Sequence, residues 1–212
     1  MTASTSNFST RERILGVAEV LFARHGFAGA SLRQVTSAAK VNLAAVNYHF
    51  GSKDGLIEEV FRRRLDELNR QRLASLAAAL ARPACTLEDV LDAFIRPALE
   101  QSMDSAGGAA FVRVLARAYA EHDERLRRFL ADNYGHVLRE FVIAFARLLP
   151  GLAREELHWR LDIVAGALTY AMADFGMIKR RQEVSEHSHR DMTIRHLIQF
   201  TAAGLRAGCA HA

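Results

Sequence analysis

The 212-residue sequence predicts an all-α fold of about nine helices. Proline occurs only three times, alanine, leucine and arginine are abundant, and threonine and isoleucine are sparse, a composition that favours helix over strand. Residues suited to capping a helix N-terminus also recur in front of stretches whose apolar positions return every three or four residues. The 50% hydrophobic content is sufficient for a real core, in one large domain or in a small and a medium one.

The first predicted helix begins after Ser9 and stops at Gly26. Ser9 and Glu12 have the spacing of a capping box, and glycine ends helices readily because it tolerates a left-handed backbone. The apolar face of this helix is formed by Ile14, Val17, Leu21 and Phe22. Residues 1–8, ahead of the cap, are expected to form a disordered tail.

Two short helices follow in the sequence. The second predicted helix is capped by Ser31, and Gln34 completes another capping box. Its apolar face is formed by Leu32, Val35 and Ala39. The third predicted helix begins after Asn42, a favourable N-cap residue, and ends at Gly51.

A long fourth helix is capped by Ser52 and stopped by Pro83. This predicts three parts after the tail: a three-helix domain at 9–52, a connecting helix at 53–82 and a larger helical domain at 83–212.

The two short helices, joined by about three residues and braced on both sides, form a helix-turn-helix. Its second helix is free to enter the major groove of DNA. Residues 1–53 carry six Lys and Arg against two Asp and Glu, whereas residues 54–212 carry 22 of each sign. Such a local basic excess is typical of a polyanion-binding module, although a net charge of +4 also occurs by chance.

Asn47, Tyr48 and His49 form a polar and aromatic cluster that could be catalytic, buried or part of a binding surface. The helix-turn-helix favours the binding surface, because small side chains allow close approach, asparagine bonds base edges, and Tyr, His and Lys reach phosphates. Residues expected to face DNA are Ser31, Arg33, Asn42, Leu43, Ala44, Ala45, Asn47 and Tyr48, while Lys40, His49 and Lys53 are expected mostly at phosphates.

The run from Gly26 to Phe61, and above all YHFGSKDGL at 48–56, closely resembles the DNA-binding domain of the TetR family of bacterial transcriptional regulators. The segment VNLAAVNYHFGSK is also similar to regulators of fatty-acid metabolism within that family. The resemblance implies a homodimer with one helix-turn-helix per subunit and a C-terminal helical domain that dimerises and binds a small molecule. Binding of that molecule would release double-stranded operator DNA.

Two positions depart from the family pattern. Lys40 stands where the family commonly has glycine, and a left-handed conformation there would cost about 1 kcal/mol. Asn47 stands where the family usually has tyrosine, with Tyr48 beside it, whereas His49 and Lys53 match the pattern directly.

Five more helices are predicted in the larger domain. Thr86 caps the fifth, which should kink or break near residues 93–97 because Pro97 lies inside it. The later helices are expected at about 111–120, 123–149, 153–180 and 191–206, with a polar loop, QEVSEHSH, before the last.

The eighth predicted helix is apolar nearly all round and must be covered on two sides. Its small residues, which would allow close helix contact, are Gly166, Ala167, Ala171 and Ala173. We therefore expect the eighth and ninth helices to pair with their symmetry mates in a two-fold four-helix bundle. Asp174 would need a partner if buried, either across the dimer or in a ligand.

Aromatic and methionine side chains of helices five to eight are expected to line a cavity for a hydrophobic effector, with fatty acids and acyl-CoA as candidates. Ordinary core packing is the alternative for each of them. The effector set comprises Phe94, Met103, Phe111, Tyr119, Phe141, Phe145, Tyr170 and Phe175; Trp159 is a further candidate.

Other residue groups have simpler explanations. A solvated loop explains the candidate metal ligands better than a metal site does: Glu183, Glu186, His187, His189 and His196. Arg113 and Arg117, one helical turn apart, could clamp an acidic effector or form a solvated face. Cys85 and Cys209 match no ligand or redox spacing, and neither a cofactor nor a metal is expected.

Two other function classes remain open, an all-helical enzyme and an interaction module that does not touch DNA. An enzyme needs a base or nucleophile paired with an acid, and no such signature stands out around His49 or elsewhere. The first ten residues show no secretion signal, and charges interrupt the longest apolar helix pattern, so we expect a cytosolic protein without a membrane span.

Overall fold

The computed structural model describes residues 9–103, 107–121, 123–173 and 183–208. Within these ranges the backbone forms helices and no strands, which confirms the all-α prediction. The helices are α1 (Thr10–Gly29), α2 (Leu32–Ala39), α3 (Leu43–Phe50), α4 (Lys53–Leu80), α5 (Leu87–Ser102), α6 (Gly108–Glu121), α7 (Glu124–Leu148), α8 (Arg154–Met172) and α9 (Glu186–Arg206). The expected tail at 1–8 and the end of the eighth predicted helix, at 174–180, lie outside the described residues.

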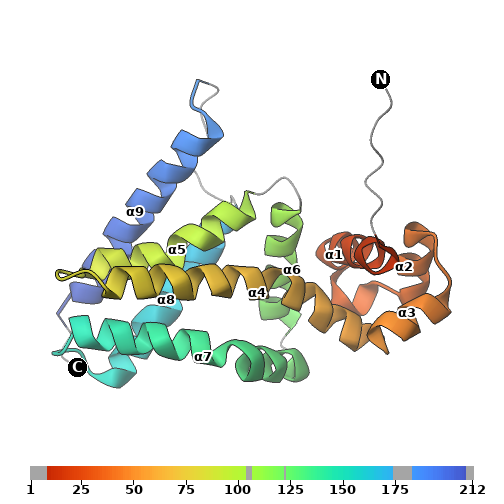
Figure 1. The fold of residues 1–212 in the computed structure, drawn as a ribbon, viewed down its shortest axis with the longest axis horizontal. Helices are drawn as coiled ribbons and strands as arrows, with labels where there is room; N and C mark the ends of the chain where they lie inside the picture. Colours follow the sequence, from red (N-terminus) through yellow and green to blue (C-terminus); the bar gives the residue numbers. More distant parts are fainter. Residues whose placement is uncertain (1–8, 104–106, 122, 174–182, 209–212) are drawn as a thin grey trace.

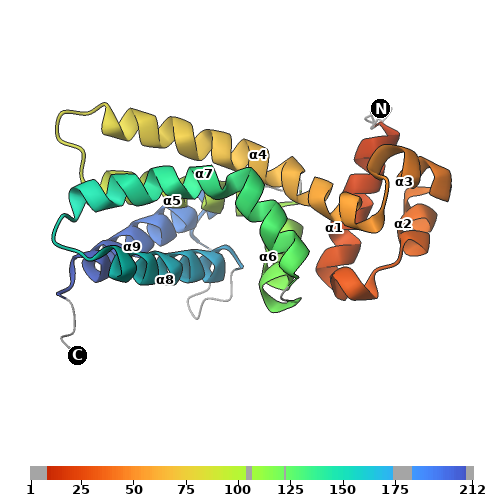
Figure 2. The same cartoon turned by 90° about the horizontal axis from the view of Figure 1, so that it is seen from below.

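The long helix α4 connects two bodies of unequal size (Figure 1). A small bundle of α1, α2 and α3 surrounds its first turns, and α5 to α9 form the larger body along the remainder. Turned by 90°, the molecule shows α7 beside α4, with α8 and α9 on the side away from α4 (Figure 2).

Two hydrophobic cores correspond approximately to these bodies. The smaller core joins α1, α2, α3 and the start of α4, and is completed by Phe111 and Val114 of α6 and Leu126 and Phe129 of α7. The larger core lies among the second half of α4 and helices α5 and α7–α9, with Val112 of α6. Helices α6 and α7 therefore contribute to both cores, which fixes the small bundle against the larger body.

The helix starts follow the predicted caps. Ser9, Ser31, Asn42, Ser52 and Thr86 each accept a hydrogen bond from a backbone N–H in the first turn of the following helix. These bonds satisfy donors that a helix N-terminus otherwise leaves without a partner.

The first helix has a sharp bend at its predicted end. Gly26 has φ 72° and ψ 175°, outside the helical region, and a short turn continues from it to Gly29. The backbone N–H of Phe27 donates to Glu121 Oε1 of α6 at 3.1 Å. The bend thus places the end of α1 against α6.

The break predicted at Pro97 does not occur. Helix α5 continues across Pro97, which is buried together with its neighbours in the larger core. Proline removes one backbone donor, but tertiary packing of an apolar face can hold a helix together. Nearby, Arg72 Nε donates to the carbonyl oxygen of Phe94 at 3.0 Å, so this carbonyl has a side-chain partner.

The last helix begins five residues earlier than predicted. Ser185 Oγ accepts from the backbone N–H of Ser188, and α9 starts at Glu186. The predicted loop therefore ends in the first turn of a helix, because the polar residues 186–189 follow a favourable cap rather than a turn sequence.

Candidate nucleic-acid interface

The α2–α3 turn closes through a left-handed residue. Lys40 has φ 53° and ψ 51°, and its backbone N–H donates to the carbonyl of Ser37 at 3.2 Å. The N–H of Val41 donates to the carbonyl of Thr36 at 3.0 Å. This helix ending usually contains glycine, because a side chain is strained at positive φ. Lys40 thus has the left-handed conformation considered for it, at a position where the family commonly has glycine.

Helix α3 is anchored by one fully buried side chain, Val46. Leu43 and Asn47 lie four residues apart on the exposed side, as do Ala44 and Tyr48. Tyr48 is 86% exposed, an unusual degree of exposure for a large aromatic residue. Ala45 is half-buried against the smaller core, so it lies at the edge of the exposed surface.

Some polar groups near α3 are already used by the fold. Asn42 Oδ1 accepts from the backbone N–H of Ala45 at 2.9 Å, which leaves the amide nitrogen of Asn42 for a partner. Ser31 and Gln34 bond each other's backbone N–H groups, at 3.2 and 2.8 Å. Ser31 is therefore a capping residue that is also exposed beside Arg33.

Basic groups flank the exposed surface of α3. Lys40 and Arg33 are exposed on the preceding turn and helix, and His49 is exposed next to Tyr48, with the two rings 5.1 Å apart edge to face. Lys53 opens α4, and its Nζ lies 3.5 Å from the carbonyl oxygen of Ala28. Ser52 Oγ caps the same helix start by accepting from the N–H of Gly55 at 3.0 Å. The sequence-predicted residues thus gather around one short helix.

A buried ion pair that sequence reasoning missed fixes α1 to α4. Arg64 Nε and Nη2 donate to the two carboxylate oxygens of Glu19 at 3.0 and 3.2 Å, and Glu19 is only 3% exposed. Burial raises the pKa of Glu19, and the hydrogen bonds from Arg64 offset part of that rise. One feature of the sequence does indicate this ion pair. The carboxylate of Glu19 interrupts the apolar stripe of the first helix, between Leu15 and Phe22.

The larger body contains an apolar cavity of about 400 Å³ beneath α4. Its walls come from α4, α5, α6, α7 and α8. Of the predicted effector set, Phe94 and Phe111 line it. Met103 lines a second cavity of about 360 Å³ between α5, α6, α8 and α9, together with Arg113 and His189.

The other members of the effector set lie elsewhere. Phe141 and Phe145 are buried in the larger core and line neither cavity. Tyr170 is half exposed on α8. The side chain of Tyr119 and the whole of Phe175 lie outside the described residues, as does Asp174.

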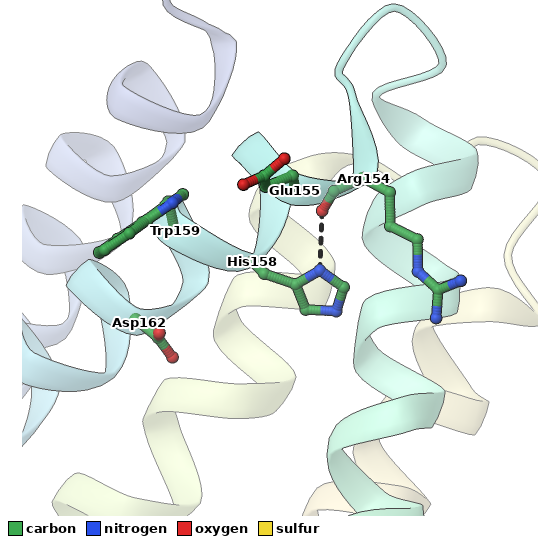
Figure 3. Close-up of a pocket in the computed structure, with 5 residues that line it drawn as sticks. All are labelled: Arg154, Glu155, His158, Trp159 and Asp162. Carbon is green, nitrogen blue, oxygen red and sulfur yellow. Dashed lines mark hydrogen bonds between the residues drawn. The ribbon is translucent and has the colours of Figure 1, made fainter.

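A further hollow of about 550 Å³ opens on the surface at the start of α8 (Figure 3). Arg154, Glu155, His158, Trp159 and Asp162 line it, and His158 Nδ1 lies 2.8 Å from the carbonyl oxygen of Arg154. Trp159 is thus a surface residue rather than part of the apolar cavity.

The histidine-rich segment forms an ordinary helix start. His187 Nε2 lies 3.1 Å from Asp191 Oδ2, one turn along α9. In the part of the chain that the structure describes, no three His, Cys, Asp or Glu side chains are grouped as metal ligands would be. Among the same residues, no helix is both long and apolar enough to cross a membrane.

The chain matches two family models that together account for both bodies. A model described as Tetracyclin repressor-like, C-terminal domain, matches residues 92–204, more than half of the chain, and the model for bacterial regulatory proteins of the tetR family matches residues 14–60. The second match contains the α2–α3 unit and the start of α4.

Individual relatives are helix-turn-helix transcriptional regulators. The probable HTH-type transcriptional regulator YttP of Bacillus subtilis is 40% identical over 24% of this chain and 25% of its own length. The HTH-type transcriptional repressor NicS of Pseudomonas putida is 36% identical over 41% of this chain and 40% of its own. The matched parts thus span less than half of these relatives.

The fold also matches over nearly the whole chain. The fatty acid degradation regulator FadR from Bacillus halodurans superposes with a TM-score of 0.64 at 15% identity, covering 96% of this chain and 100% of that one. With both family models matched along its length, the chain belongs to the TetR family of bacterial transcriptional regulators.

Proposed function

We propose that this protein is a dimeric repressor that binds a near-palindromic operator through α3 and leaves it when a hydrophobic molecule enters the larger body. The observation that carries the proposal is the exposed face of α3, where Tyr48 is 86% exposed and Leu43 50% exposed over a single buried anchor. On this account residues 9–52 bind DNA, 53–82 connect, and 83–212 bind the effector and dimerise.

The arrangement of side chains supports distinct roles at the DNA. Leu43, Ala44 and Asn47 face outward from α3, where small, apolar and amide groups can meet base edges and thymine methyls. Lys40, His49 and Lys53 surround them and suit phosphates, which position the protein without reading sequence.

Exposed apolar residues on α8 and α9 support the dimer. On α9, Phe200 is 73% exposed, and on α8, Ile163 is 65% exposed. By their spacing, the exposed residues Trp159 and Tyr170 share one face of α8 with Ile163. Large exposed apolar side chains that share a helix face are typical of an interface with another protein. Two-fold pairing of α8 and α9 with a second copy would cover these side chains and place two α3 helices on one face of DNA.

The apolar cavity beneath α4 supports an effector that is mostly hydrophobic. Its volume lies within the range of about 300–1,000 Å³ that small-molecule pockets occupy. A fatty acid, or the acyl part of an acyl-CoA, belongs to this class. The likeness to FadR concerns the fold and leaves the effector to experiment.

An electrophoretic mobility shift with DNA from upstream of the protein's own gene tests the function, at low and at high salt. The proposal expects a discrete complex that weakens as salt rises and disappears on addition of the effector. If no complex forms at any salt concentration, an enzyme or an interaction module becomes the better explanation.

A further inference from the structure

Among the described residues that line the apolar cavity beneath α4, one buried polar side chain has no use in the fold. Tyr134 O–H donates to Asp66 Oδ1 at 2.7 Å, and Thr169 O–H donates to the carbonyl oxygen of Ala165 at 2.9 Å. Asn69, in the middle of α4, is different, because its amide makes no hydrogen bond with any described residue.

Asn69 is only 7% exposed, yet its side chain lines the cavity. Buried polar groups in folded proteins nearly always have a hydrogen-bond partner, and one without a partner costs stability. At the wall of a cavity, the amide of Asn69 can instead form its hydrogen bonds with a polar group of a bound ligand.

Resting on the proposed effector function, we propose that Asn69 selects an apolar effector that carries one neutral hydrogen-bonding group, an alcohol, ketone or amide. The asparagine amide both donates and accepts, so it can bond any of these groups. The remainder of the effector lies against apolar wall residues such as Leu68, Phe94 and Leu130.

The charges at the cavity favour a neutral group over an ionised one. Arg72 lines the wall, but its Nε is bonded to the carbonyl oxygen of Phe94 and its guanidinium lies 4.1 Å from the centre of the Phe94 ring. Asp162, an exposed carboxylate, also lines the cavity and opposes an anion. An anionic head group would lose its hydration and meet the Asp162 carboxylate, while the one cation among the described residues of this wall, Arg72, is already engaged by Phe94.

Isothermal titration of the full chain with octan-1-ol, octanamide and octanoate tests this, because the three probes share a chain and differ in the head group. Asn69→Leu removes the amide at similar volume. Thr169→Val is the matched control, since that hydroxyl lines the same cavity but already bonds its own helix.

The wild-type protein is expected to bind the alcohol and the amide more tightly than octanoate. Asn69→Leu should weaken both neutral probes roughly 3- to 10-fold, the loss of about one net hydrogen bond, while Thr169→Val changes them less than twofold. Without any probe, Asn69→Leu should raise Tm, because it replaces a polar side chain at a largely apolar wall with an apolar one.

The tightest binding for octanoate would overturn the proposal, as would a failure of all three probes to bind. Unchanged affinities in Asn69→Leu, or a lower Tm for that variant, would show that the amide has a structural role instead. The mobility shift of the wild-type protein without probes tests the proposed function separately, so the two failures can be told apart.

Discussion

At the scale of single residues, Lys40 strains the fold but places a positive charge where DNA is proposed to bind. Its positive φ is required to turn the chain from α2 into α3, and a non-glycine residue there is strained. The side chain is exposed beside α3, where a cation can meet a phosphate. Strain retained at a binding surface is consistent with a functional lysine.

Replacing Lys40 by glycine should raise the free energy of unfolding by up to about 1 kcal/mol, because glycine adopts the left-handed conformation without strain. Urea denaturation measures this. The same variant should bind DNA more weakly, with the salt dependence reduced by about 0.9 in log–log slope if one phosphate contact is lost. Lys40→Ala is the control, since it removes the charge and keeps the strain; greater stability in that variant would contradict the account.

Lys53 and Asn47 should differ in the kind of DNA binding they support. Lys53→Ala is expected to weaken binding to specific and random DNA by a similar factor, because a phosphate contact carries no sequence information. Asn47→Ala should instead change the preferred bases, by about 1–3 kcal/mol at the position it reads. Binding to a randomised operator library measures both, and the reverse pattern would exchange the two assigned roles.

At the scale of helices, local rules predicted the N-terminal part well and the later part less well. The caps at Ser31, Asn42 and Ser52 depend on neighbouring residues, and such signals can be read from the sequence. The continuity of α5 across Pro97 depends on packing against helices far away in the chain, and local rules carry no information about it. The same limit applies to the candidate site, because the apolar pattern predicts burial but does not distinguish Phe94 at the cavity from Phe141 in the core.

The start of α5 provides a pH-dependent test. The backbone N–H and hydroxyl of Thr86 donate to Asp89, and these bonds lower the pKa of Asp89 below its usual 3.8. The stabilisation is therefore present above about pH 3.8 and is lost as the pH falls through the lowered pKa.

Asp89→Asn should accordingly reduce Tm at pH 6 and leave Tm near that of the wild type at a pH below the lowered pKa of Asp89. Thermal unfolding followed by circular dichroism measures the difference across this range. A Tm difference that is the same at every pH would show that the carboxylate charge does not contribute to the cap.

At the scale of the whole molecule, α4 connects the two proposed sites. Lys53 begins this helix beside α3, and Asn69 faces the cavity 16 residues later, about 24 Å along the axis at 1.5 Å per residue. Arg125 of α7 also pairs with Asp54 and Glu58 of α4, so the start of the connecting helix is held by the larger body. One rigid element is therefore in contact with both the effector cavity and the DNA-facing bundle.

The dimer should depend on the exposed apolar residues of α8 and α9. Phe200→Glu introduces a charge where a second copy is proposed to pack, so it should shift the protein from dimer to monomer. Sedimentation at micromolar concentration measures this. Leu43→Glu is a control at another exposed apolar site, on α3, and a monomer in the wild type would contradict the proposed interface.

Hydroxyl-radical footprinting of the protein on its own upstream DNA tests the central claim most directly. A dimer that reads DNA with α3 predicts two protected blocks related by a dyad, with centres about 34–36 Å apart or a multiple of that distance. The blocks should be weaker for Asn47→Ala. A single block, or protection that is unaffected when α3 is altered, would contradict the account.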